Sequence, residues 1–243
     1  MIQGPGSIIG RQLISEDGLN GLIVAGSYAT GEKIKKSVTT NAKLLLHMGG
    51  KSNAIIDKDC DIDLAATEII ASFCRASGQR PDAIARVLVV KEAFPSLVSS
   101  LIEKIASIRI GYGDRAQIDL GPLISESVQN RYLRFGNSLV NFGHKSIIDV
   151  EKEDIENVNG FYVRPAIYEI DWKNHGIIGD VEPTGPIIML YSVESFSEGV
   201  LIHNQFGFRR TVSVFSANTD GVKGAFIDSG AISINHVLRE DER

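Results

Sequence analysis

The sequence predicts an α/β fold with a largely parallel sheet, because short apolar segments alternate with segments of helical periodicity along the chain. Residues 21–25 are apolar throughout, which is typical of a parallel strand covered on both faces. Residues 63–77 space their apolar side chains as an amphipathic helix does. With 243 residues, 43% of them hydrophobic, the chain is long enough to bury a sizeable core.

The remaining elements follow from the same patterns. Ser7 is a candidate N-cap for a first short helix that reaches residue 14, and Pro95 suits the first turn of a helix over 94–108. Further helices are expected at residues 30–38, 125–142, 195–203 and 222–226. Further strands are expected at residues 42–48, 52–56, 86–90, 147–148, 163–168, 186–191, 212–215 and 232–235.

Composition excludes several classes of function. A net charge of -5 and a pI near 5.6 argue against nucleic-acid or anionic-membrane binding as the main task. The sequence contains no apolar run of the roughly 20 residues that a membrane span needs. Its start lacks the basic and apolar regions of a signal peptide. Two cysteines, Cys60 and Cys74, suit a reducing cytoplasm better than a disulfide scaffold.

Seven short motifs lie along the chain in a recognisable order. They are Gly26-Ser27-Tyr28-Ala29-Thr30-Gly31, His47-Met48-Gly49-Gly50-Lys51, Gly121-Pro122-Leu123-Ile124, Gly160-Phe161-Tyr162-Val163-Arg164-Pro165, Glu182-Pro183-Thr184-Gly185-Pro186, Asn204-Gln205-Phe206-Gly207-Phe208 and Gly230-Ala231-Ile232-Ser233-Ile234-Asn235. An eighth segment, Gly78-Gln79-Arg80-Pro81, leads into a predicted strand. Each motif alone is weak, but their common order and spacing carry weight.

Together these motifs resemble the aldehyde dehydrogenase superfamily over nearly the whole chain, with a weaker likeness to its succinylglutamate-semialdehyde branch. The resemblance implies NAD(P)-dependent oxidation of a small aldehyde to a carboxylate. It also implies a partial Rossmann-like cofactor domain at residues 1–46 and a three-layer catalytic domain at 47–243. Since the family's chains extend beyond both ends of this one, the sequence is interpreted as truncated at both ends.

The resemblance also shows where the family's chemistry is lost. In the family, a cysteine thiolate attacks the aldehyde and a glutamate activates the water that releases the acid. Pro81 stands at the cysteine's position and His47 at the glutamate's. Proline has no thiol and no backbone N–H, so it cannot attack a carbonyl carbon. We therefore expect no catalytic residue of the family's kind and an inactive protein.

Neither cysteine is a strong replacement for the missing nucleophile. Cys74 precedes Pro81 by seven residues and falls on the apolar stripe of its helix, which favours an inert buried thiol. Cys60 lies in an aspartate-rich turn and is interpreted as an incidental surface thiol. The histidines are scattered without metal-ligand spacing, so no metal site is expected.

Four residues are candidates for NAD or NADP binding by resemblance: Gly26, Ser27, Gly31 and Glu182. Ser27 would offer its hydroxyl and neighbouring N–H groups to a pyrophosphate, and Glu182 would hydrogen-bond a ribose. Thr184 replaces a phenylalanine that packs beside the nicotinamide in the family. The competing interpretation is that these residues only form the tight strand–helix turns of the fold.

Three hypotheses about function remain open from the sequence. The first is a cytoplasmic, inactive remnant of an aldehyde dehydrogenase. The second is a regulatory or binding pseudoenzyme that holds a nucleotide, or pairs with a second copy or with a full-length homologue. The third is residual chemistry through an unexpected nucleophile such as Cys74. Half a Rossmann-like domain also leaves a sheet edge uncovered, which invites association.

Overall fold

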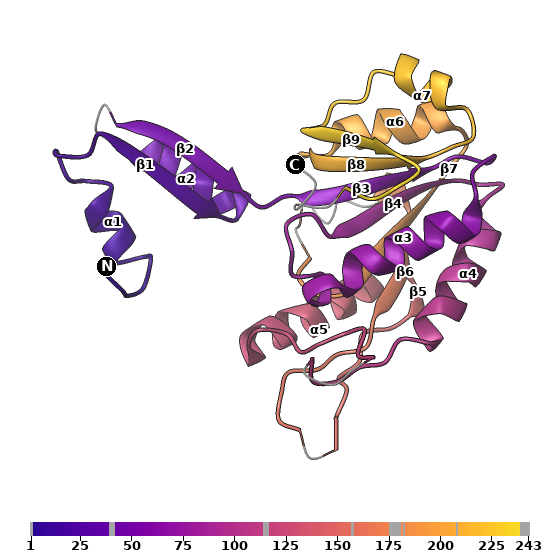
Figure 1. Cartoon of the computed structure of the whole chain (residues 1–243), viewed down its shortest axis with the longest axis horizontal. Coiled ribbons are helices and arrows are strands. Elements are labelled where there is room, and N and C mark those ends of the chain that lie inside the picture. The colour runs from indigo at the N-terminus through magenta and orange to yellow at the C-terminus, as the bar shows by residue number, and fades with distance from the viewer. Residues whose placement is uncertain are drawn as a thin grey trace. The chain divides into compact units, whose positions relative to one another are not determined.

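The computed structural model of the chain contains two units, Met1–Gly50 and Lys51–Arg243, called here the N-terminal and the C-terminal unit (Figure 1). The structure describes residues 2–38, 42–113, 117–156, 158–174, 181, 183–207 and 209–238. The boundary predicted from the sequence lay between residues 46 and 47. The assignment of the first part to cofactor binding and of the second to catalysis stays a prediction.

The elements follow one another in the predicted alternation of helix and strand. In chain order they are α1 (Ile9–Leu13), β1 (Gly21–Gly26), α2 (Tyr28–Ser37), β2 (Lys43–Met48), β3 (Lys51–Ile56), α3 (Ile62–Cys74), the 3-10 helix η1 (Arg75–Gly78), β4 (Ile84–Val90), α4 (Phe94–Ala106), α5 (Glu126–Asn141), β5 (Lys145–Ile148), β6 (Ala166–Glu169), the 3-10 helix η2 (Trp172–Asn174), β7 (Ile187–Val193), α6 (Phe196–Gln205), β8 (Arg209–Phe215), α7 (Thr219–Gly224) and β9 (Ala231–Ile234).

The N-terminal unit is built on the parallel pair β1–β2, with α2 packed against it (Figure 1). Side chains along both strands alternate between exposed and half-buried, as a sheet with one covered face requires. Ile23, on β1, is 74% exposed, and Leu45, its cross-strand partner on β2, is 55% exposed. The prediction that residues 21–25 are covered on both faces is therefore wrong for the described chain.

The C-terminal unit contains a seven-stranded sheet in the order β5-β6-β7-β4-β3-β8-β9. All neighbouring strands are parallel except β5 and β6, which are antiparallel. The central strand β4 is buried along its whole length and lies between β3 and β7. This parallel-dominated sheet confirms the α/β prediction.

Two apolar cores, one on each face of the sheet, make the C-terminal unit a three-layer structure. Alternate residues of β4 divide between them: Leu88 and Val90 face the core formed with α5, α6 and α7, while Val87 and Val89 face the core formed with α3 and α4. This alternation follows from the two-residue period of a strand. Because both faces are covered, the parallel strands consist of nearly continuous apolar runs.

Short polar side chains fix where several helices begin. Asp61 accepts a hydrogen bond from the N–H of Leu64 at the start of α3, and Ser195 caps α6 in the same way. Pro95 lies in the first turn of α4, as predicted. The predicted cap at Ser7 is wrong, because Ile8 precedes the first turn of α1 and makes no side-chain cap.

The helix predicted over residues 63–77 ends earlier, at Cys74. Beyond it, Ala76, Ser77 and Gly78 have φ angles of 47°, 54° and 69°, in the left-handed region. Three successive residues there cannot continue an α-helix and turn the chain sharply toward β4. This turn places Pro81 in a loop at the amino-terminal end of the central strand.

Candidate functional site

The loop between α3 and β4 carries Pro81 and is held by contacts to distant segments. The Ser77 hydroxyl donates to the carbonyl of Gly121 over 2.7 Å, and the side-chain oxygen of Gln79 accepts from the N–H of Ile124 over 2.9 Å. A methyl group at Gly78 would lie 2.6 Å from the carbonyl carbon of Gly185, so these two glycines pack backbone against backbone. Two of the seven motifs found in the sequence, those at residues 121–124 and 182–186, thus contact this loop.

Pro81 itself lies in a turn closed by its two neighbours. The Arg80 guanidinium donates two hydrogen bonds, of 2.9 and 3.1 Å, to the Asp82 carboxylate, whose side chain is only 8% exposed. The N–H of Ala83 reaches back to the Arg80 carbonyl over 3.2 Å. Pro81 is partly buried. Position 81, which the resemblance predicts to correspond to the family's nucleophile, is therefore part of a braced turn, and its proline side chain offers no nucleophilic atom.

Cys74, at the end of α3, packs against the core beneath that helix. Burial raises the pKa of the Cys74 thiol to about 12, and the negative charge of Asp119 adds to the effect. A thiol becomes a useful nucleophile only as the thiolate. The partial burial agrees with the apolar stripe seen in the sequence.

Cys60 is not the surface thiol that the sequence suggested. It is partly buried and also packs against the core under α3. Burial raises the pKa of the Cys60 thiol to about 11, with further contributions from Asp59, Asp57 and Asp61. The aspartates around Cys60 suggested an exposed turn, whereas the cysteine packs against the core.

His47 is exposed on β2, in the N-terminal unit, while Pro81 belongs to the C-terminal unit. Ala25 of β1 is its cross-strand partner. Within its own unit, His47 adjoins no thiol, because both cysteines belong to the C-terminal unit.

The three N-terminal candidates for cofactor binding surround the start of α2. Ser27 is exposed and caps this helix: its hydroxyl accepts from the N–H of Thr30 over 3.3 Å and lies 2.9 Å from the Thr30 hydroxyl oxygen. Gly26 is exposed and has room for a side chain. Gly31 is buried, and a methyl group there would lie 2.9 Å from Cγ of Met48. Gly31 therefore serves the packing of α2 on β2.

Ser27 and Gly26 leave the amino-terminal end of α2 open, and such an end attracts a phosphate group. Among the described residues of the N-terminal unit, this helix end fits one phosphate group. Glu182, the fourth candidate, lies outside the described residues. Thr184, two residues further on, is partly buried and precedes Gly185, the residue that packs on the loop carrying Pro81.

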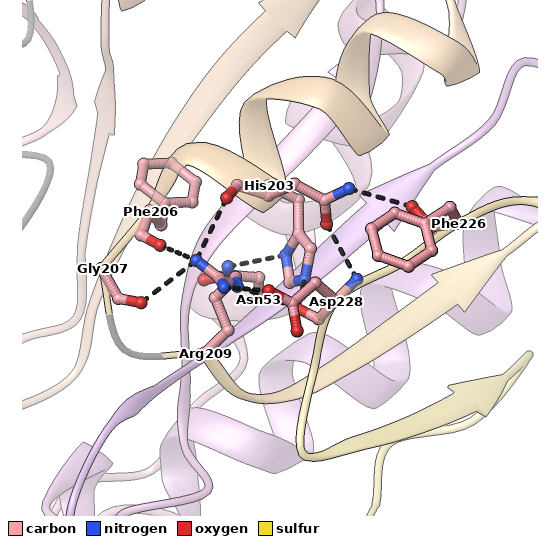
Figure 2. Close-up of polar contacts among 8 residues, drawn as sticks. Asn53, His203, Phe206, Gly207, Arg209, Phe226 and Asp228 are labelled. Atoms are coloured by element: carbon pink, nitrogen blue, oxygen red, sulfur yellow. Dashed lines mark hydrogen bonds and ion pairs between the residues drawn. The ribbon is translucent and has the colours of Figure 1, made fainter.

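A buried polar network in the C-terminal unit was missed in the sequence (Figure 2). His203, on α6, is fully buried. Its Nδ1 lies 2.9 Å from the side-chain nitrogen of Asn53 on β3, and its Nε2 lies 3.2 Å from the carbonyl oxygen of Asp228. These partners fix the tautomer, because Nε2–H must donate to the carbonyl and Nδ1 must accept from the amide. Burial lowers the pKa of His203 to about 4.

Two more side chains extend this network around the segment that follows α7. The Arg209 guanidinium donates to the carbonyls of Phe206 and Asp228 and pairs with the Asp228 carboxylate (Figure 2). The Asn204 side chain donates to the Phe226 carbonyl and accepts from the N–H of Asp228, each over 2.9 Å. The network therefore ties β3, α6, β8 and the segment before β9 together.

The described residues contain no group of three or more histidine, cysteine, aspartate or glutamate side chains arranged to hold a metal ion. Among the same residues, no helix is long and apolar enough to cross a bilayer.

The fold and the loop before β4 define the class: an α/β protein with the architecture of solved aldehyde dehydrogenases. The structure of an aldehyde dehydrogenase from Bartonella henselae superimposes with a TM-score of 0.89 at 25% identity, over 98% of this chain and 50% of that one. The structure of HpcC from Thermus thermophilus gives a TM-score of 0.90 at 22% identity, over 98% of this chain and 48% of that one.

The sequence matches the aldehyde dehydrogenase family over residues 1–243, and the chain belongs to this family. The alpha-ketoglutaric semialdehyde dehydrogenase of Bacillus subtilis (strain 168) is 30% identical over 239 residues, which are 97% of this chain and 49% of that protein. The lactaldehyde dehydrogenase of Methanococcus maripaludis (strain C5) is 29% identical over 213 residues, or 88% of this chain and 44% of that protein. The chain spans about half the length of these curated relatives.

Proposed function

We propose that this member of the aldehyde dehydrogenase family does not oxidise aldehydes by the thiol route. The observation that carries the proposal is Pro81, which occupies the loop before β4 between Arg80 and Asp82. Covalent attack on an aldehyde requires an ionisable nucleophile within reach of the carbonyl carbon. Pro81 supplies none, and the ion pair across it holds the turn in its present shape.

The two cysteines support the same proposal. The thiols of Cys60 and Cys74, with pKa values of about 11 and 12, are almost entirely protonated at neutral pH. Little thiolate is therefore available from either cysteine near neutral pH. His47 is the residue that the resemblance places at the general base, and a base without a nucleophile does not complete the reaction.

Purified protein is expected to reduce neither NAD+ nor NADP+ above the blank with a panel of small aldehydes, followed by absorbance of the reduced cofactor. Turnover that a Cys74→Ser substitution abolishes would contradict the proposal and would identify Cys74 as the nucleophile. Turnover that survives this substitution but is lost in Cys60→Ser would also contradict it, whereas turnover that survives both substitutions would reveal a route without a thiol.

The same proposal predicts slow thiol chemistry, which can be measured without any cofactor. Cys60 and Cys74 are expected to react with a disulfide reagent at pH 7 roughly 10- to 100-fold more slowly than an accessible cysteine, because little thiolate is present. A Pro81→Cys variant in a Cys60→Ser, Cys74→Ser background is expected to add one fast-reacting thiol. The double Ser background alone is the matched control. Fast reaction of wild-type Cys74 would contradict the pKa argument.

A second candidate function is a nucleotide-holding pseudoenzyme, favoured by the open amino-terminal end of α2 behind Ser27. The 1-pyrroline-5-carboxylate dehydrogenase from Thermus was solved with bound NAD, and the NADP-dependent glyceraldehyde-3-phosphate dehydrogenase from Bacillus halodurans C-125 with NADP. Under this candidate, calorimetry shows saturable binding of NAD+ or NADP+ without turnover. In the other version of this candidate, the chain regulates a full-length homologue by pairing with it.

Substitution of Ser27 tests the nucleotide-holding candidate sharply. Aspartate and asparagine both cap helices well, so α2 should persist in Ser27→Asp and in Ser27→Asn. Only the aspartate adds a negative charge, which repels a phosphate at the helix end. Binding that Ser27→Asp abolishes and Ser27→Asn retains supports this candidate. If binding survives both changes, the nucleotide binds elsewhere on the protein. If the wild type binds no nucleotide, this candidate function is wrong.

A further inference from the structure

The pair Asn159-Gly160 lies in a loop that joins two paired segments of the C-terminal unit. Lys152 in the first segment and Val163 in the second form an antiparallel bridge. The N–H of Glu153 also donates to the carbonyl of Tyr162 over 3.1 Å, so both ends of the loop are held. Between these ends, the asparagine and the glycine are exposed and belong to no helix or strand. The loop is therefore fixed at its base and open to water at this pair.

The packing of Tyr162 requires a glycine at position 160. Tyr162 is buried, with 1% of its surface exposed. A methyl group on Gly160 would lie 2.5 Å from Cε2 of the Tyr162 ring and 2.9 Å from its Cζ. A ring enclosed in a close-packed core has little room to retreat. The fold therefore keeps the residue after Asn159 without a side chain.

The side chain of Asn159 and the N–H of Gly160 make no hydrogen bond with the described residues. The nearest backbone bonds run from the N–H of Val158 to the carbonyl of Ile155 and from the N–H of Leu123 to the carbonyl of Phe161. These bonds flank the pair and do not include it. Because glycine has no Cβ, its nitrogen can be approached closely and its backbone turns easily. The asparagine side chain can therefore rotate toward the glycine nitrogen without breaking a bond of the loop.

We propose that Asn159 is a site of spontaneous deamidation. The backbone nitrogen of Gly160 loses its proton and attacks Cγ of Asn159, which closes a succinimide ring. The bond from Cγ to Nδ2 breaks, and ammonia leaves with a proton taken from water. Water then opens the ring at Cγ to give aspartate, or at the backbone carbonyl to give isoaspartate. Water is consumed and ammonia is released, and the reaction needs neither an oxidant nor a reductant.

Both products alter the loop. Each adds one negative charge to the formal net charge of -5, which becomes -6, in a segment where Glu151 and Glu153 already pair with Arg164. Isoaspartate also lengthens the main chain by one carbon just before Phe161, whose carbonyl accepts from the N–H of Leu123 over 2.9 Å. Amide hydrogen exchange at Leu123 is therefore expected to become faster in the isoaspartate form.

Peptide mass spectrometry of the full chain during incubation at neutral pH tests the proposal. The peptide that carries Asn159 is expected to gain about 1 Da, as the amide nitrogen gives way to oxygen, and to separate into aspartate and isoaspartate forms. Because the loop does not obstruct the reaction, the rate in the folded chain should lie within about threefold of the rate in denaturant. Asn159→Gln should lose the gain at this position, since the longer side chain closes its ring much more slowly.

Asn20, the other asparagine that precedes a glycine, serves as the control for the effect of local sequence. In denaturant, Asn20 and Asn159 should react at similar rates, and Asn159→Gln should leave the reaction of Asn20 unchanged. The proposal is overturned if the Asn159 peptide of the folded chain keeps its mass while the denatured chain reacts. A folded rate more than about threefold below the denatured rate would also overturn it, because the loop would then hinder the ring closure.

Discussion

Replacing Gly78 by alanine is expected to destabilise the C-terminal unit by about 2–4 kcal/mol. Gly78 has a φ angle of 69°, which alanine adopts at a cost, and its new methyl group would lie 2.6 Å from the carbonyl carbon of Gly185. The obstacle is backbone, so no side-chain rotation relieves it. Gly185 has little freedom to retreat, because a methyl group on its own Cα would lie 2.6 Å from the Tyr132 ring.

Chemical denaturation of the full chain measures this cost, with Gly143→Ala as the matched control. Gly143 also has a positive φ angle, 85°, but no atom lies within 4 Å of the added methyl group. Its substitution should therefore cost only the backbone strain, about 1 kcal/mol. A cost at Gly78 no larger than at Gly143 would mean that the loop carrying Pro81 is not packed against residues 183–186.

The contact between Gly78 and Gly185 helps the loop that carries Pro81 to keep its shape. It joins the segment before Pro81 to the motif around Thr184, two regions far apart in the sequence. The Tyr132 hydroxyl supports the same place by donating to the Arg164 carbonyl over 2.6 Å. Packing between distant segments therefore holds this loop in shape, whatever residue stands at position 81.

Much of this fold could be predicted because its signals are local. The apolar run of β4 and the caps Asp61 and Ser195 each act within a few residues of the element they define. Such signals depend on strand periodicity and on unsatisfied N–H groups at helix starts. The order of the strands in the sheet, however, depends on contacts between distant segments, and it was not predicted.

The candidate site was predictable only where a motif marked it. Pro81 was found from its position in a motif, but its bracing by Arg80 and Asp82 depends on side-chain geometry that the sequence does not encode visibly. His203 gave no signal, since its partner Asn53 lies 150 residues away. A histidine on the inner face of a helix, just before the motif that begins at Asn204, is the one pattern that could have indicated a buried network.

The stability that His203 contributes is expected to disappear as the pH falls from about 6.5 to about 4. Burial lowers the pKa of His203 from 6.5 to about 4 in the folded protein, and the positive charges of Arg209 and Arg86 act in the same direction. The hydrogen bond to the carbonyl of Asp228 and the charge of its carboxylate partly oppose them. Folding therefore favours the neutral ring, so its contribution is complete above pH 6.5. This difference in pKa corresponds to roughly 3 kcal/mol.

Denaturation of the wild type and of His203→Gln across this pH range isolates the effect. At pH 7 the variant should be less stable by about 2 kcal/mol, because the Asn53 amide and the Asp228 carbonyl lose well-placed partners. As the pH falls toward 4, that advantage of the wild type should shrink and then reverse, since only the wild type must bury or release a charged imidazole. A His236→Gln variant, altered at an exposed histidine, should follow the wild-type profile. Parallel stability profiles for the wild type and His203→Gln would contradict this prediction. They would show that the protonation of His203 does not change the stability of the network that joins β3, α6 and the segment before β9.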